Sequence, residues 1–340
     1  MPAHLACTLP QRRCGRSRQR GSVLIYVVWV LMLLSLFGAS VGSQGLFAVD
    51  LAERVSEQLK AAYIARAAVQ YAALTLKQDE SPLVDSLNDQ WSNNPQVFQE
   101  RRVADGQFRI VGHGPVPGQP WYGLTDEERR VNLNTAPVDV LERLAEEVGE
   151  LRPFEAAEVA DAIADWRDED HDRRPAGAEN SSYRSLGYDA KDGPFENLEE
   201  LLLVKGVSPE LYRRLEEVVT VYGSGQVNLN TASERVLQAL GLSEAAIQGF
   251  LEFRAGPDGV PGTPDDGRLV SIHTLADDLK AIMPAHDITR LEQLAQQKFL
   301  GVRSHDFRMT IEAQTARAPS RITVACVLDR DGHVNLWDER

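Results

Sequence analysis

Carboxylate side chains are concentrated in one short segment, Asp168–Glu179. Asp168, Asp170 and Asp172 alternate with other residues, and Glu179 stands at the twelfth position when Asp168 is counted as the first. Alternate side chains of a loop can converge on one point, where a terminal Glu chelates an ion with both oxygens. A site that contains only hard oxygen donors suits Ca²⁺. The segment is therefore a candidate calcium site.

The spacing of these acids is that of an EF-hand loop, but the match is incomplete. The sixth position holds Arg173, where the EF-hand loop has an invariant Gly for its sharp turn. Pro175 and Gly177 indicate a loop conformation for the segment. A solvated acidic loop without an ion is the alternative, and the residue pattern leaves both interpretations open. We expect His171, which lies within the cluster, to face solvent rather than an ion.

A second acidic loop runs from Asp258 to Gly267. Asp258, Asp265 and Asp266 lie among Gly and Pro residues and form a weaker candidate metal site. Because their spacing matches no metal-binding template, the pattern favours a surface turn over a bound cation.

No catalytic signature accompanies these acids. The sequence contains no P-loop, H-E-x-x-H or C-x-x-C motif, and its seven His residues are scattered without ligand spacing. With 50 Asp and Glu residues, no pair stands out as a general acid and base. We therefore predict that the protein is not an enzyme.

The elements that must position the first acidic segment carry an internal repeat. Three pairs of segments correspond: 131–136 (Val-Asn-Leu-Asn-Thr-Ala) with 227–232, 165–167 with 252–254, and, loosely, 195–201 with 270–275. A duplication of helical units explains this pattern. Thr135 and Thr231 are predicted to be helix N-caps, the latter within a capping box completed by Glu234. Residues 131–303 should be mostly helical.

The same repeat is also typical of helix-hairpin-helix modules that bind DNA. Such modules need a Gly-rich hairpin whose backbone N–H groups contact phosphate. Neither repeat contains one, and Val204-Lys-Gly-Val207 is the nearest candidate. The net charge of -14 also opposes binding to a phosphate backbone. An envelope-anchored nucleic-acid-binding protein nevertheless stands as the alternative function.

Alternating patterns on both sides of the helical part predict strands. They cover residues 107–111, 307–313, 321–326 and 333–337, with a hairpin turn at Asp331-Gly332. The polar residues 79–105 are expected to form a loop. The economical fold is one antiparallel sheet packed on an N-terminal helix, with the helical part inserted. Cys326 falls in a strand pattern and is expected to be a packing residue, and no disulfide framework is predicted.

That N-terminal helix begins as a membrane segment. Ser22–Val49 contains no charged residue and follows five Arg in residues 1–21, an asymmetry that places the N-terminus in the cytoplasm. From Asp50 to Gln78 the pattern becomes amphipathic. Its predicted buried face includes Leu51, Val55, Leu59, Ala62, Tyr63, Val69 and Leu74.

Three interpretations compete for the leader. It could be a secretory signal cut near residue 43, an uncleaved anchor, or a prepilin-type leader cut between Gly21 and Ser22. The basic residue and Gly before the apolar segment resemble the third class. The helical pattern continues well beyond residue 43, which favours a prepilin. Most pilin-like helices carry Glu at the fifth mature position, where this chain has Tyr26.

Taken together, these features resemble the K family of type II secretion minor pseudopilins, in which the pilin Glu is typically missing. The resemblance spans nearly the whole chain, and its most specific part runs from Asp165 to Gly206. It rests on Arg20-Gly21, Tyr26, Val131–Ala136, Asp165–Asp170, Gly177–Glu179, Tyr183, Leu198–Leu201 and Val204–Gly206.

This resemblance implies an inner-membrane precursor, cleaved by the prepilin peptidase and methylated, with a periplasmic body. It implies a place at the pseudopilus tip with minor pseudopilins I and J, and contacts with other pseudopilins and the inner-membrane assembly platform. It also implies bound Ca²⁺, with Asn180 where an acid is common in the family.

The expected fold is α+β, pilin-like, with an inserted duplicated helical domain of the SAM-like or helix-hairpin-helix-like kind. The expected parts are a leader (1–21), a transmembrane helix (22–48), the pilin-like helix and first strands (49–130), the inserted helical domain (131–303) and the C-terminal strands (304–340).

Overall fold

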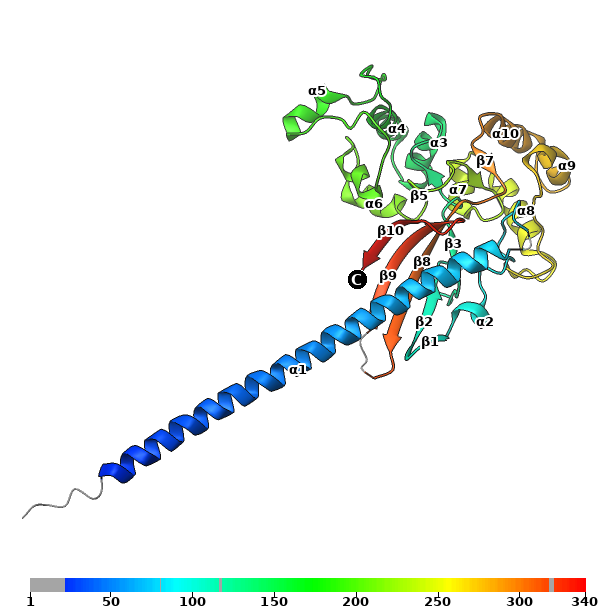
Figure 1. Cartoon of the computed structure of the whole chain (residues 1–340). Helices are drawn as coiled ribbons and strands as arrows, with labels where there is room; N and C mark the ends of the chain where they lie inside the picture. Colours follow the sequence, from blue (N-terminus) through cyan, green and yellow to red (C-terminus); the bar gives the residue numbers. More distant parts are fainter. Residues whose placement is uncertain (1–21, 80, 116–117, 318–320) are drawn as a thin grey trace, which may run out of the picture. The chain divides into compact units, whose positions relative to one another are not determined.

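The computed structural model describes residues 22–79, 81–115, 118–317 and 321–340 (Figure 1). The predicted cleavage residue Gly21 and the basic cluster before it lie outside the described residues, as do Cys7 and Cys14. The chain divides into two compact units, Met1–Ser56 and Glu57–Arg340. Each unit is described by itself below.

The first unit, in its described part, is helical throughout and belongs to α1 (Ser22–Lys77). Within it, the 19 residues Val23–Val41 are long and apolar enough to cross a membrane. Tyr26 is 71% exposed, like its apolar neighbours. This finding fits a single membrane anchor near the N-terminus.

In the second unit, α1 packs on the sheet through a face in which five of the eight buried side chains are alanine. The buried side chains of this face are Ala61, Ile64, Ala65, Ala68, Val69, Ala72, Ala73 and Leu76. The predicted face was wrong for the larger residues, because Leu59, Tyr63 and Leu74 are at least half exposed. Small side chains let the helix backbone approach the sheet closely, so the alanine-rich stripe is the one that packs.

The sheet joins segments from both ends of the chain. Its strands are β1 (Arg101–Val103), β2 (Gly106–Val111), β3 (Thr125–Asp126), β8 (Asp306–Thr315), β9 (Arg321–Asp329) and β10 (Val334–Glu339). The order is β1-β2-β8-β9-β10, with β3 also pairing with β8, and all pairs are antiparallel. The predicted strands at 107–111 and after residue 306 are confirmed. Cys326 is fully buried in β9, where burial raises the pKa of its thiol to about 12.

The region expected to be a loop before β2 is partly ordered into elements. It contains a short helix, α2 (Pro95–Phe98), and β1, which forms a hairpin with β2 through Ala104 and Asp105. Pro95 begins α2, where its missing N–H costs little. Phe98 is fully buried and contacts Tyr71 of α1 edge to face, so tertiary packing stabilises this segment.

Between β3 and β8 lies the helical region, which we define as residues 131–303. Figure 1 shows it gathered at one end of the sheet. Its helices are α3 (Val138–Arg143), η1 (Leu144–Val148), α4 (Pro153–Arg167), α5 (Asn180–Tyr183), η2 (Arg184–Leu186), η3 (Leu198–Leu203), α6 (Pro209–Leu215), α7 (Glu234–Ala239), α8 (Glu244–Ala255), η4 (Ile272–Thr274), α9 (Leu275–Leu279) and α10 (Ala285–Gln296). Two short parallel pairs join β4 (Val131–Asn132) to β5 (Val219–Thr220), and β6 (Val227–Asn228) to β7 (Leu300–Gly301).

The duplication is visible in matching hydrogen bonds. Asn134 donates to the Phe195 carbonyl at 3.0 Å and accepts from the Phe195 N–H at 2.7 Å. Asn230 makes the same two bonds with Leu269, at 3.0 and 2.8 Å. The second copy of the Phe195 segment therefore begins at Leu269, one residue before the position that the sequence comparison indicated.

The arginines of the repeat also match. Arg167 donates to the carbonyls of Leu133 and Ala136, and Arg254 donates to those of Leu229 and Ala232. Each arginine thus ties the last turn of its helix to the Asn-Leu-Asn-Thr-Ala segment of its own repeat.

The helix N-caps differ from the predictions. Helix α7 is capped by the Ser233 side chain, which accepts from the Val236 N–H, and α3 is preceded by Pro137. Thr231 and Thr135 instead form hydrogen bonds with Asp126 and with the Gly225 carbonyl. Distant partners engage both hydroxyl groups, so the helices begin later in the sequence.

The described residues of the second unit form two hydrophobic cores, one within residues 131–303 and one outside them. One comprises buried residues of the helical region from Val131 to Leu300. The other joins α1, α2 and the sheet, with Trp91, Phe98, Phe108 and Phe307 among its largest side chains.

Candidate metal site and polar junction

The first acidic segment folds back onto the end of α4. Asp165, in the last turn of α4, is fully buried, and its carboxylate accepts a hydrogen bond from the Arg174 N–H at 3.2 Å. Gly177 passes so close that an added Cβ would lie 2.0 Å from Asp165 Oδ2. Only glycine fits there, so the loop is held tightly around the Asp165 carboxylate.

Behind this loop lies a group of buried carboxylate oxygens without hydrogen-bond partners. The members of this group, unpartnered within the described residues, are both carboxylate oxygens of Glu179, Oδ1 of Asp168 and Oδ1 of Asp192. Glu179 is only 5% exposed. Buried oxygens that accept no hydrogen bond are costly, which is the condition that a cation relieves.

Glu179, Asp192 and His171 can each offer a ligand atom, and these three atoms lie within 4.8 Å of one another. His171 is largely exposed, and its Nδ1 lies 3.1 Å from Asp192 Oδ2. The side chain faces solvent as predicted, although it borders the group.

Electrostatics in the group oppose full ionisation of the acids. Burial raises the pKa of Glu179, and the charges of Asp192 and Asp165 raise it further. Burial likewise raises the pKa of Asp168, with Asp170 adding to the effect and Arg174 opposing it. A divalent cation would reverse this balance by favouring the charged carboxylates.

The structure brings together some of the residues predicted from the sequence and separates others. Asp170 and Asp172 are exposed, and Asp170 Oδ1 accepts from the Asp172 N–H at 2.8 Å. Neither belongs to a three-residue group of potential ligands among the described residues. Asn180 begins α5, and its Oδ1 accepts from the Ala190 N–H at 2.8 Å. The alternating acids therefore do not converge as in an EF-hand.

Asp192 was missed by sequence reasoning. It lies well beyond the acidic segment, in a turn before Gly193 with a positive φ of 49°. The Lys-Asp-Gly sequence indicates a turn, but no local pattern connects that turn with Glu179.

The second acidic loop uses its carboxylates internally. Asp258 accepts from the Val260 N–H at 2.7 Å, and Asp266 from the Gly262 N–H at 2.7 Å. Asp265 accepts from the Thr263 hydroxyl at 2.6 Å and from the Asp258 N–H at 3.2 Å. Among the described residues, these acids form no group of three potential ligands. The geometry is that of a surface turn held by its own side chains.

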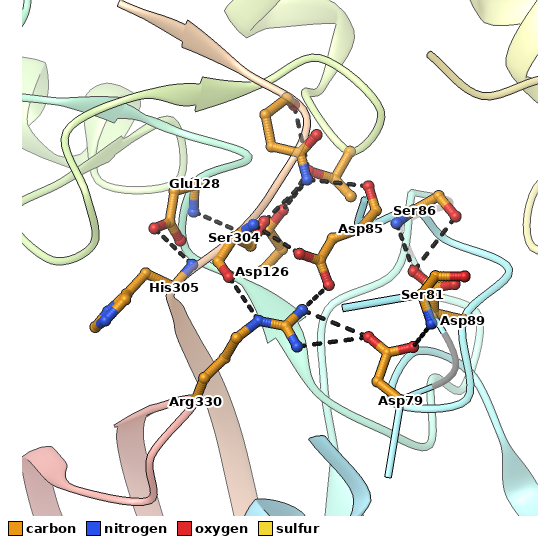
Figure 2. A network of polar contacts seen from close by, with 12 residues as sticks. Asp79, Ser81, Asp85, Ser86, Asp89, Asp126, Glu128, Ser304, His305 and Arg330 are labelled. Carbon is orange, nitrogen blue, oxygen red and sulfur yellow. Dashed lines mark hydrogen bonds and ion pairs between the residues drawn. The ribbon is translucent and has the colours of Figure 1, made fainter. Parts of the chain in front are cut away.

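A buried polar junction connects the sheet to the helical region (Figure 2). Asp126, at the end of β3, accepts from the Glu128 N–H at 2.7 Å, from Asn228 Nδ2 at 3.0 Å and from the Thr231 hydroxyl. Asn228 Nδ2 also lies 2.9 Å from Ser304 Oγ. The second repeat is thus bonded directly to the two segments that lead into and out of the helical region.

Two further acids complete this junction. Glu128 accepts from the backbone N–H groups of Ser224, His305 and Asp306 at 2.9, 2.8 and 3.2 Å. Asp85 accepts from the Ser304 N–H at 2.7 Å and pairs with Arg330, as Figure 2 shows. Burial raises the pKa of Glu128, followed by the charge of Asp126. Because each carboxylate has several donors, the junction fixes the helical region on the sheet.

Comparisons with known proteins agree with this architecture. Residues 123–224 match the family model described as type II secretion system (T2SS), protein K. The type II secretion system protein K of Klebsiella pneumoniae is 27% identical over 233 residues, covering 63% of this chain and 67% of that protein. The protein of the same name from Aeromonas hydrophila is 27% identical over 228 residues, with the same coverage.

The fold is similar to that of one protein in the crystal structure of the GspK-GspI-GspJ complex from enterotoxigenic Escherichia coli. The TM-score is 0.60 at 20% identity, and the match covers 85% of this chain and 97% of that one. The segment matched by the family model contains the first repeat and the candidate metal site. These matches do not favour a nucleic-acid-binding protein. The chain is therefore similar to type II secretion system protein K, and the family model matches its residues 123–224.

Proposed function

We propose that this protein is a minor pseudopilin that caps the tip of the periplasmic pseudopilus together with minor pseudopilins I and J. It would support export of folded proteins across the outer membrane, in a structural rather than a catalytic role. The observation that carries this proposal is the fold, which matches nearly the full length of one protein from the GspK-GspI-GspJ complex.

The bulk of the helical region supports a position at the tip. It is inserted between β3 and β8 and has a hydrophobic core of its own. A subunit within the shaft must be surrounded by neighbours, whereas a terminal subunit has one free side. An insertion of this size would hinder packing within the shaft.

Tyr26 supports the same position. In a typical pilin-like helix, the Glu at this place would neutralise the N-terminal amine of an adjacent subunit. A phenol carries no negative charge at neutral pH and cannot do so. A subunit that has no subunit above it does not need this carboxylate.

For membrane attachment, we propose a single-pass inner-membrane protein whose N-terminus is cytoplasmic and whose body is periplasmic. The prepilin peptidase would cleave between Gly21 and Ser22, and the new N-terminus would be methylated. The Arg-rich segment before Ser22 and the apolar stretch Val23–Val41 support this topology.

The exposed apolar residues of α1 supply a surface for neighbouring pseudopilins. In the second unit, Leu59 and Tyr63 lie four residues apart on α1 and are 56% and 65% exposed. These exposed apolar side chains form a stripe on which other apolar helices can pack, in the bilayer or in the filament.

We further propose that Ca²⁺ binds between Asp168, Glu179 and Asp192. The unpartnered buried oxygens of these three acids support this assignment, and their hard donor set suits calcium. When bound, the ion would neutralise the carboxylates and hold the loops containing Asp168 and Asp192 together. Asp170, Asp172 and Asn180 have other environments, so we propose that they do not ligate the ion directly.

The function is tested by co-expressing the full-length protein with minor pseudopilins I and J and isolating the complex from detergent-solubilised membranes. N-terminal sequencing of the same sample should begin at Ser22. Immunogold labelling should place the protein at filament ends. Even distribution along the filaments would contradict the tip position, and a mature N-terminus near residue 43 would contradict the pseudopilin assignment.

A further inference from the structure

A cavity of about 410 Å³ lies between the second repeat and the segment that connects β3 to β4. Its lining is mostly apolar, with Pro115, Ala232, Leu251 and Pro261 among the residues that form it. Two arginines, Arg129 and Arg254, also line it. We call this cavity the arginine pocket. Mostly apolar pockets of this size with a few convergent polar groups are typical ligand sites.

Both arginines lack a carboxylate ion-pair partner in the part of the protein that the structure describes. Arg254 is 8% exposed, donates only to backbone carbonyls, and has a buried Nε without a partner. Arg129 Nη1 donates to the His113 carbonyl at 2.7 Å. Glu234 and Glu252 line the cavity too, but they are not buried and form no ion pair with either arginine. Two cationic groups therefore share one pocket, and nearby acids act on them without forming an ion pair: Asp126, Glu127 and Glu217 on Arg129, and Asp266 on Arg254.

In the first repeat, the carboxylate that favours the charged arginine is adjacent to it in the sequence. Arg167 makes the same kind of carbonyl contacts as Arg254, but the next residue is Asp168, which favours the charged guanidinium. In the second repeat the corresponding residue is Ala255, and the favourable charge comes instead from Asp266 of the second acidic loop. The two copies thus differ in where the favouring carboxylate lies.

Charge repulsion between the two arginines adds to the cost of burying them. Burial lowers the pKa of Arg254 to about 10, and the positive charge of Arg129 contributes to this shift. Burial also lowers the pKa of Arg129 to about 10, with Arg130 as the next cause. An anion placed between them would stabilise both charged forms.

We propose that the arginine pocket binds a carboxylate presented by an apolar segment of a partner polypeptide. The planar guanidinium pairs well with carboxylates, and the aliphatic lining suits side chains that flank the charge. Inorganic phosphate has no apolar surface that it could bury against the lining of the pocket. The carboxylate can belong to an Asp or Glu residue or to the C-terminus of the polypeptide. This inference does not depend on the proposed function.

The test uses the full-length protein in detergent and fluorescence anisotropy with three labelled peptides. Acetyl-Ala-Leu-Glu-Leu-Ala-amide carries the carboxylate of its Glu, and acetyl-Ala-Leu-Gln-Leu-Ala with a free C-terminus carries a terminal one. Acetyl-Ala-Leu-Gln-Leu-Ala-amide carries none. We expect at least one acidic peptide to bind at least tenfold more tightly than the neutral one, and the tighter of the two identifies the source. Equal binding of all three peptides would overturn the proposal.

Substitutions locate the site. Arg129→Gln should weaken binding of the acidic peptide at least fivefold, because the Arg129 guanidinium would lose its charge while giving up one hydrogen bond to His113. Arg152→Gln is the matched control, since Arg152 is exposed and pairs with Glu155. Leu251→Glu supplies a carboxylate inside the pocket and should abolish binding by itself. Unchanged binding in both Arg129→Gln and Leu251→Glu would contradict the assignment. In a separate competition experiment, acetate should displace the acidic peptide at a lower concentration than phosphate does. Displacement by both anions at the same concentration would also contradict the assignment.

Discussion

Glu179 and Asp192 meet at the end of α4, where each offers a carboxylate oxygen within 4.8 Å of the other. Both carry a buried oxygen that accepts no hydrogen bond. This pair, rather than the row of alternating acids, is the centre of the candidate calcium site, and two predictions follow from it.

Calcium should stabilise the protein through Glu179. Free Ca²⁺ at 100 times its Kd would add about 2.7 kcal/mol to the free energy of unfolding. Addition of EDTA should therefore lower the Tm of the wild type. The Glu179→Gln variant should show little response to EDTA. Asp170→Asn is the control, because Asp170 is exposed, and it should behave as the wild type does. Equal responses in Glu179→Gln and the wild type would contradict the site.

The effect of calcium should grow with pH. Without the ion, the pKa of Glu179 in the folded state is raised above 4.5 by burial and by Asp192. A raised pKa gives stability that is present below the unfolded pKa and is lost as pH rises through the folded pKa. Calcium binds the deprotonated acids, so it restores stability in that upper range. The difference in Tm between calcium and EDTA should be small near pH 4.5 and larger at pH 8. A difference that shrinks as pH rises would count against this account.

The two faces of α1 should respond differently to substitution. Tyr63 is 65% exposed, so Tyr63→Glu should change the free energy of unfolding by less than about 0.5 kcal/mol. The same change should reduce recovery of the complex with pseudopilins I and J. Ala68 is fully buried against the sheet, and Ala68→Leu should destabilise the fold by about 1–3 kcal/mol. Urea denaturation and co-purification measure the two effects. Normal complex recovery with Tyr63→Glu would show that this stripe is not a contact surface.

The repeated asparagines offer a matched pair. Asn230 is 3% exposed, and Asn230→Ala would leave both the N–H and the carbonyl of Leu269 without their partner. We expect a loss of about 2–3 kcal/mol, since unsatisfied buried groups cost about 1–3 kcal/mol each. Asn134 is less buried, and water can replace part of its bonds, so Asn134→Ala should cost about 1 kcal/mol. Urea denaturation of both variants measures which one loses more free energy of unfolding. A greater loss in Asn134→Ala than in Asn230→Ala would contradict this prediction.

The period of the side chains was enough to predict the elements themselves. Strict alternation around Phe307–Ala313 and Arg321–Cys326 predicted β8 and β9, and the Asp331-Gly332 turn predicted their hairpin partner β10. The absence of charge between Ser22 and Val49 predicted the apolar part of α1. The recurrence of Val-Asn-Leu-Asn-Thr-Ala predicted the duplication. These signals are local, because they depend on residues that are neighbours in the sequence.

Tertiary structure alone decided which partners these elements met. Leu59 and Tyr63 have the hydrophobicity of core residues, yet the alanine stripe packs on the sheet because small side chains allow a closer approach. Thr231 had the pattern of an N-cap, but the buried Asp126 carboxylate engages its hydroxyl. Asp192 lies near Glu179 because its neighbour Gly193 bonds through its N–H to the Trp166 carbonyl of α4, at 3.4 Å. Such choices depend on contacts between distant segments, and these form only when the whole core closes.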